Sequence, residues 1–161
     1  MKLWPTKERH FRFADSKAHT LERLKRRTEY SEWLTSNHTE KSFRGVIEDN
    51  HFKLITSEIG FGAFCVMEGT INETTGTIKV TIHNVFKGFL SLFMLFPIAG
   101  FIMVTFFDKQ EFSWIMLLVV LLQIVIIRFA IIELVFRRLS KRSLKSLRDV
   151  LDVEWGLTQG V

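Results

Sequence analysis

The feature that most constrains this chain is an uninterrupted run of 20 uncharged residues, 88–107. A helix of about 20 apolar residues, rising about 1.5 Å per residue, spans a hydrocarbon layer about 30 Å thick. A second apolar segment, 113–136, follows after only a short polar stretch. The sequence therefore predicts a membrane region over residues 87–136, built as a hairpin of two transmembrane helices at about 88–107 and 113–136.

Pro97 and Gly100 lie inside the first of these segments. A proline in a water-exposed helix argues against the helix, whereas a bilayer tolerates it as a kink. We therefore expect a kink in the first helix at these two residues.

The distribution of charge predicts how the hairpin is oriented. Residues 137–154 hold six positive and three negative charges, whereas the connection between the two apolar segments has one lysine. The positive-inside rule then places both termini in the cytoplasm. A single cysteine and the lack of an apolar leader in residues 1–30 agree with that side of the membrane. We expect a multi-pass protein of the bacterial inner membrane.

Residues 1–42 are interpreted as a basic, aromatic arm followed by a surface helix. Trp4, Arg9 and Arg12 suit a layer of lipid headgroups or a partner surface, with a frayed tail as the alternative. Asp15 is expected to cap a helix over 16–34.

Residues 43–86 change to the period of a β-strand. Residues 43–48 and 52–56 alternate around a turn at Asp49, and a second hairpin follows around residues 72–76. The two hairpins echo each other, because Gly45 and Gly69 occupy equivalent positions. This pattern predicts a small antiparallel β-meander with one face that needs a cover.

The C-terminal region, 137–161, is expected to form a basic amphipathic helix. Such a helix covers the sheet or lies on an anionic leaflet, and we favour the cover because further apolar residues extend its surface. Its apolar face is drawn from Leu139, Leu144, Leu147, Leu151 and Trp155, and the cations expected to contact headgroups or a partner are Arg137, Arg138, Lys141 and Arg142.

The patterns FRGVIEDNHFKLI at 43–55 and MEGTINETTGTIKVTI at 67–82, followed by two apolar segments and a basic helix, support a resemblance. The chain resembles uncharacterised small bacterial membrane proteins with a pleckstrin-homology-like strand module, over residues 43–152. The resemblance implies a strand module, PH-like or half-barrel, separated from its C-terminal helix by the membrane hairpin. It implies no activity and no site. The expected fold class is thus membrane α+β.

No arrangement of residues predicts catalysis, a metal or a cofactor. The five histidines are scattered, the single Cys65 lies in an apolar strand, and the adjacent carboxylates Glu48 and Asp49 fall at a turn. The net charge is +5, but the basic residues flank the apolar segments and do not line a folded face, so we expect no nucleic-acid partner.

Three polar residues inside the second apolar segment are the main candidates for function: Gln123, Arg128 and Glu133. At about 100° per residue, Arg128 lies about 140° from each of the others, so no single polar stripe is expected. In one interpretation Arg128 reaches the headgroups at the end of the span. In the other, an oligomer uses Gln123 and Arg128 to line a pore.

We therefore expect a non-catalytic inner-membrane protein whose cytoplasmic β-module binds a partner or lipid headgroups, as a scaffold, sensor or accessory subunit. The alternative is an oligomeric channel or membrane-disrupting effector gated by that module. The expected partners are membrane lipids and either further copies of the chain or another membrane protein.

Overall fold

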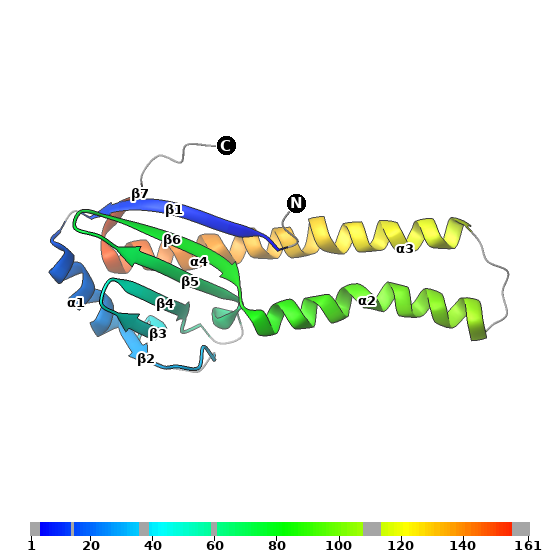
Figure 1. The fold of residues 1–161 in the computed structure, drawn as a ribbon, viewed down its shortest axis with the longest axis horizontal. Coiled ribbons are helices and arrows are strands. Elements are labelled where there is room, and N and C mark those ends of the chain that lie inside the picture. Colours follow the sequence, from blue (N-terminus) through cyan, green and yellow to red (C-terminus); the bar gives the residue numbers. More distant parts are fainter. Residues whose placement is uncertain (1–3, 14, 36–38, 59–60, 108–113, 156–161) are drawn as a thin grey trace. The chain divides into compact units, whose positions relative to one another are not determined.

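The computed structural model describes residues 4–13, 15–35, 39–58, 61–107 and 114–155. The chain divides into two compact units. One combines Met1–His83 with Arg138–Val161, and the other is Asn84–Arg137. The first unit is built on a sheet and the second is helical (Figure 1).

The sheet has seven strands in the order β2-β3-β4-β5-β6-β1-β7. β2 pairs with β3 in parallel, and every other pairing is antiparallel. With the helices described below this is an α+β fold. The strands are β1 (Thr6–Phe13), β2 (Thr28–Tyr30), β3 (Phe43–Glu48), β4 (His51–Thr56), β5 (Cys65–Ile71), β6 (Thr75–Ile82) and β7 (Val153–Trp155), with a short 3₁₀ turn at Gly62–Phe64 before β5.

The central four strands, β3 to β6, form the antiparallel meander that the alternating sequence predicts. Asp49 adopts a left-handed conformation (φ 43°) in the two-residue connection between β3 and β4. Gly69 is required for packing, because a Cβ atom at this position would overlap the Phe52 ring. Its equivalent in the first hairpin, Gly45, has a φ of 150°, and a Cβ atom there would overlap the Lys53 carbonyl.

The interpretation of the N-terminal residues as a separate arm is wrong. Residues 6–13 form β1, which pairs with β6 from Thr6↔Thr81 to Arg12↔Thr75. The physical reason is that Phe11 is 1% exposed and packs where Gly76 leaves room for its ring. The pairing also satisfies the backbone hydrogen bonds along one edge of β6.

The helix expected over 16–34 is shorter, and its cap is a different residue. α1 spans Lys17–Arg27, and the side chain of Ser16, rather than Asp15, accepts a hydrogen bond from the His19 N–H. The helix ends because Thr28 turns into the extended conformation of β2, while its hydroxyl donates to the Leu24 carbonyl.

The helix expected over residues 137–161 also ends early. α4 spans Glu133–Leu151, and Asp152 then takes a left-handed conformation (φ 52°). Trp155, expected on the apolar face of this helix, instead lies in β7 opposite Phe11 of β1. The edge of β1 offers backbone partners there, and the β-branched Val153 suits a strand.

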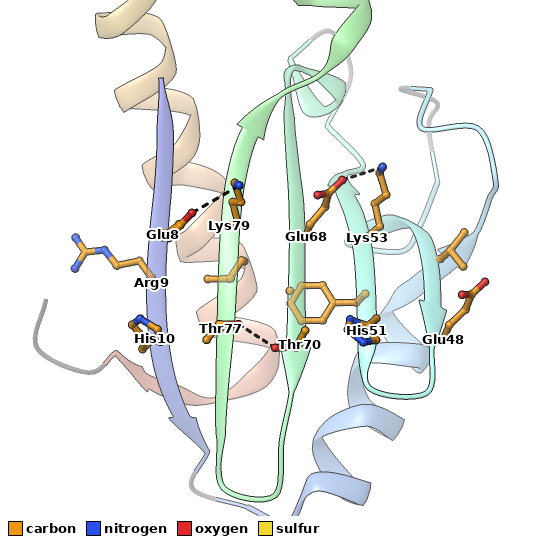
Figure 2. A pocket seen from close by; sticks show the side chains of 14 residues that line it. Glu8, Arg9, His10, Glu48, His51, Lys53, Glu68, Thr70, Thr77 and Lys79 are labelled. Carbon is orange, nitrogen blue, oxygen red and sulfur yellow. Dashed lines mark hydrogen bonds and ion pairs between the residues drawn. The ribbon is translucent and has the colours of Figure 1, made fainter. Parts of the chain in front are cut away.

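One face of the sheet forms the core of the first unit. Leu54, Met67 and Val80 are fully buried on it, and from residue 138 onward α4 lies behind this face (Figure 2). Leu147 and Leu151 of α4 are buried, in agreement with the favoured role of this helix as the cover.

The helical unit contains two long apolar helices. α2 spans Asn84–Phe107, and the second begins as α3 (Trp114–Ile126) and continues through a π-helical turn (Ile127–Ile132) into α4. By length and composition, Asn84–Phe106 and Trp114–Leu151 are both able to cross a membrane. In the most apolar 18-residue stretch of each helix, 0% of the first and 6% of the second is buried. The expected connection at 108–112 lies outside the described residues.

Candidate functional site

The face of the sheet opposite α4 carries two rows of polar side chains that run across the strands (Figure 2). Residues directly opposite each other on neighbouring strands share a face, so the register fixes each row. The first row is Lys53, Glu68, Lys79 and Glu8, and the second is His51, Thr70, Thr77 and His10.

The first row alternates in charge. Lys53 Nζ lies 2.8 Å from Glu68 Oε1, and Lys79 Nζ lies 3.7 Å from Glu8 Oε1. All four side chains are between 46% and 63% exposed. Exposed pairs of this kind contribute about 0–1 kcal/mol to stability, so the row adds little to the stability of the sheet.

The second row places a histidine at each end of a threonine pair. The hydroxyls of Thr70 and Thr77 are hydrogen-bonded at 2.9 Å. His51 and His10 lie three strands apart, a separation of about 14 Å from the usual strand spacing. They are therefore too far apart to share a metal ion or a proton.

A hollow of about 720 Å³ lies over these rows. Val46 and Glu48 on β3 also line it from the same face. Phe52, Gly69 and Ile78, which border it as well, alternate with the rows and belong to the covered face, where Phe52 is 3% and Ile78 1% exposed. The exposed side chains of the hollow are therefore mainly charged and hydroxyl groups, with Val46 as an apolar side chain on the same face.

Sequence reasoning missed this site. In the sequence the histidines are scattered. His10 and His51 belong to one row only because β1 pairs with β6, and residues 6–13 were not expected to form a strand. Glu8 and Lys79, direct partners in the sheet, are likewise far apart in sequence. The available signal was short, the alternation of Phe11, Arg12 and Phe13 at the end of the segment.

Within the described residues, no group of three or more His, Cys, Asp or Glu side chains is placed to hold a metal ion. Burial raises the pKa of the Cys65 thiol to about 12, which keeps it protonated and unreactive. The Glu32 carboxylate raises the pKa of the exposed Tyr30 hydroxyl, and this hydroxyl donates a hydrogen bond to Glu32 Oε1. Neither group belongs to the rows.

Arg128 and Glu133, expected on different faces of their helix, are brought together. Arg128 Nη1 lies 3.8 Å from Glu133 Oε2, and Glu133 Oε1 accepts a hydrogen bond from Arg137 Nε at 3.0 Å. The expected separation of 140° is wrong because residues 127–132 are π-helical and do not follow 100° per residue. The Arg128 guanidinium also lies 5.3 Å from the centre of the Phe129 ring.

Gln123 is not part of that group. It lines a smaller hollow of about 360 Å³ together with Phe93, Phe96, Pro97, Ile126 and Ile127. Pro97 lies inside a helix that is continuous from Asn84 to Phe107. Gly100 is not in the lining, and a Cβ atom there would meet nothing within 4 Å.

The residues expected to contact headgroups fall into two places. Arg9 and Arg12 belong to β1, where Arg9 lines the larger hollow, and Trp4 precedes that strand half-buried. The cations of α4 are exposed, and Arg142 Nη2 pairs with Glu58 Oε1 at 3.0 Å. The exposed cations on α4 are Arg137, Arg138, Lys141, Arg142, Lys145 and Arg148.

Comparison of the chain with protein-family models, with curated proteins and with solved structures gives no match.

Proposed function

We propose that the chain is a non-catalytic integral membrane protein whose sheet unit binds a protein partner on its open polar face. The observation that carries this proposal is that the sheet has one face covered by α4 and one hollowed face with two polar rows. The same chain carries two long apolar helices that the fold leaves unburied.

The membrane part of the proposal rests on the two helices. α2 has 24 residues, which corresponds to about 36 Å of helix and exceeds the hydrocarbon thickness of about 30 Å. Large side chains remain exposed along both helices, among them Phe96 at 75% and Ile115 at 75%. Contiguous apolar surface of this extent in water drives association, whereas lipid covers it.

The binding part rests on the open face. Antiparallel sheets commonly pack one face on the core and leave the other in solvent, and the solvent face of this sheet carries the two polar rows. The alternating charges of the first row favour a partner whose charges alternate in the complementary pattern. The hydroxyls of Thr70 and Thr77 offer hydrogen-bonding groups in the middle of the face.

The exposed cations of α4 are proposed to contact anionic lipid headgroups. α4 continues without interruption from α3, so the cations directly follow the apolar stretch in one helix. Basic residues in that position are attracted to an anionic leaflet by about 1 kcal/mol each. They are the sequence feature that favours the bacterial inner membrane with both termini in the cytoplasm.

The alternative function is a channel. The polar residues Gln123 and Arg128 in the second apolar helix support this alternative. Arg128, however, is compensated by Glu133 of the same chain. A compensated charge is less suited to attract ions into a pore, which favours the anchor. Ion flux through proteoliposomes, compared between the wild type and Arg128→Ala, separates the two functions, because the anchor predicts no flux from either protein.

Site-specific photo-crosslinking in cells tests the binding face. A photoreactive residue at Thr77, in the middle of the face, is expected to give one defined adduct, and the same residue at the exposed Glu22 of α1 is the control. The adduct should disappear when Lys53 and Lys79 are both replaced by Glu. Absence of an adduct at Thr77, or equal adducts at both positions, would contradict a partner on this face.

A further inference from the structure

The smaller hollow is lined by residues of α2 and of the helix that begins as α3, and α2 and α3 contact each other. Gln123 is the only lining residue with a polar side chain, and this side chain is exposed. The other five lining residues are Phe93, Phe96, Pro97, Ile126 and Ile127.

Pro97 changes the hydrogen bonding of this hollow. A proline has no N–H, so the bond that residue 97 would donate to the carbonyl of Phe93, four residues earlier, is not formed. The Gln123 amide has two N–H donors and one carbonyl acceptor. One side of the hollow thus has a backbone acceptor without its helical donor, and the other has a side chain with donors.

In the membrane-inserted state proposed above, on which this inference rests, no water is present in the hydrocarbon layer to hydrogen-bond these groups. An unsatisfied polar group in hydrocarbon costs several kcal/mol, so the Gln123 carbonyl requires a donor from outside the lining. Apart from Gln123 itself, Trp114 is the one residue of α3 whose side chain carries an N–H or O–H group.

The side chains around Gln123 favour contact with another helix. Val119 and Ile126, one turn before and after it, are 46% and 48% exposed and lie on its side of α3. Amide side chains such as that of Gln hydrogen-bond across the interfaces of membrane helices.

We propose that a second copy of this chain packs against α3, with the two Gln123 side chains hydrogen-bonded to each other across a twofold axis. A primary amide is self-complementary, so each Gln123 donates one N–H to the carbonyl of the other. The remaining N–H of each is available to the Phe93 carbonyl of its own chain. A second copy supplies the missing donor and acceptor together.

Cysteine crosslinking in proteoliposomes tests this dimer. In a Cys65→Ala background, Val119→Cys is expected to form a crosslinked dimer. Leu121→Cys is the matched control, since Leu121 is 55% exposed but lies about 160° from Gln123 around the helix. Replacing Gln123 with Leu should weaken dimerisation about threefold to tenfold, while Gln123→Asn keeps most of it.

Equal crosslinking at both cysteines, or no effect of Gln123→Leu, would overturn the proposal. Alkaline extraction of the same membranes distinguishes this failure from failure of the proposed function. A chain that stays in the membrane without dimerising contradicts only the dimer, whereas a chain that is extracted contradicts membrane insertion itself.

Discussion

Arg128 and Glu133 lie one above the other across a π-helical turn, with Nη1 and Oε2 3.8 Å apart. In an α-helix, residues five apart point in different directions, and the i→i+5 spacing of a π-helix aligns them. The Arg128 side chain is only 13% exposed, so the Glu133 carboxylate lowers the free-energy cost of burying its charge. The π turn thus compensates a charge in an otherwise apolar stretch of helix.

Replacing Glu133 with Gln should destabilise the chain by about 1–3 kcal/mol, because Arg128 keeps its charge but loses the Glu133 carboxylate. The measurement is the denaturation midpoint of the detergent-solubilised protein.

The double replacement Arg128→Leu and Glu133→Leu is the matched control. Removing both charges together should cost clearly less than removing Glu133 alone. If the double variant is less stable than Glu133→Gln, the pair does not act as a compensated unit.

Gly69→Ala should destabilise the sheet by about 1–3 kcal/mol, because the added methyl group overlaps the Phe52 ring. Gly88→Ala in α2 is the control, since a Cβ atom there meets nothing within 4 Å. Denaturation midpoints of the two variants provide the comparison, and equal midpoints would contradict the close packing of Gly69 and Phe52.

Cys65 should react with a small maleimide very slowly in the folded protein. With its pKa raised to about 12, the thiolate fraction near pH 8 is about a thousandfold below that of a thiol with a pKa of 9, and burial slows the reaction further. Labelling followed by mass spectrometry measures the rate before and after unfolding. Similar rates in the two states would show that Cys65 is not buried.

The same pKa predicts an alkaline loss of stability. The folded thiol keeps its proton up to a pH of about 12, whereas the unfolded thiol loses it near 9.0. The unfolded state therefore binds fewer protons in this interval, and stability falls as the pH rises through it. Cys65→Ala should lack this component of the pH dependence, and identical pH profiles for the two proteins would refute it.

Lys53→Gln should change stability by no more than about 1 kcal/mol, because its ion pair with Glu68 is exposed to solvent. The same variant should weaken crosslinking from position 77 if the first polar row recognises a partner. A large loss of stability would instead make Lys53 a structural residue.

Local patterns predicted the meander and the two apolar helices. The alternation around Asp49 and the 20-residue uncharged run each lie within one short segment, so no knowledge of distant contacts was needed. β1 and β7 were missed because their partners are far along the chain, as in the pairings Arg9↔Ile78 and Phe11↔Trp155.

The candidate site was less predictable for the same reason. The row of Lys53, Glu68, Lys79 and Glu8 exists only once the register of four strands is known. Gln123, Arg128 and Glu133 were recognised as unusual from their apolar surroundings. Their grouping was predicted incorrectly for Glu133, because a regular helix was assumed where the chain forms a π turn.

Alkaline carbonate extraction of membranes from cells that produce the full chain tests the central claim, membrane insertion, most directly. The account predicts that the protein remains in the membrane pellet. It also predicts that replacing both Phe96 and Leu118, which are 75% and 66% exposed on the two helices, with Arg releases it or abolishes its accumulation. Recovery of the wild-type chain in the soluble fraction would contradict the account.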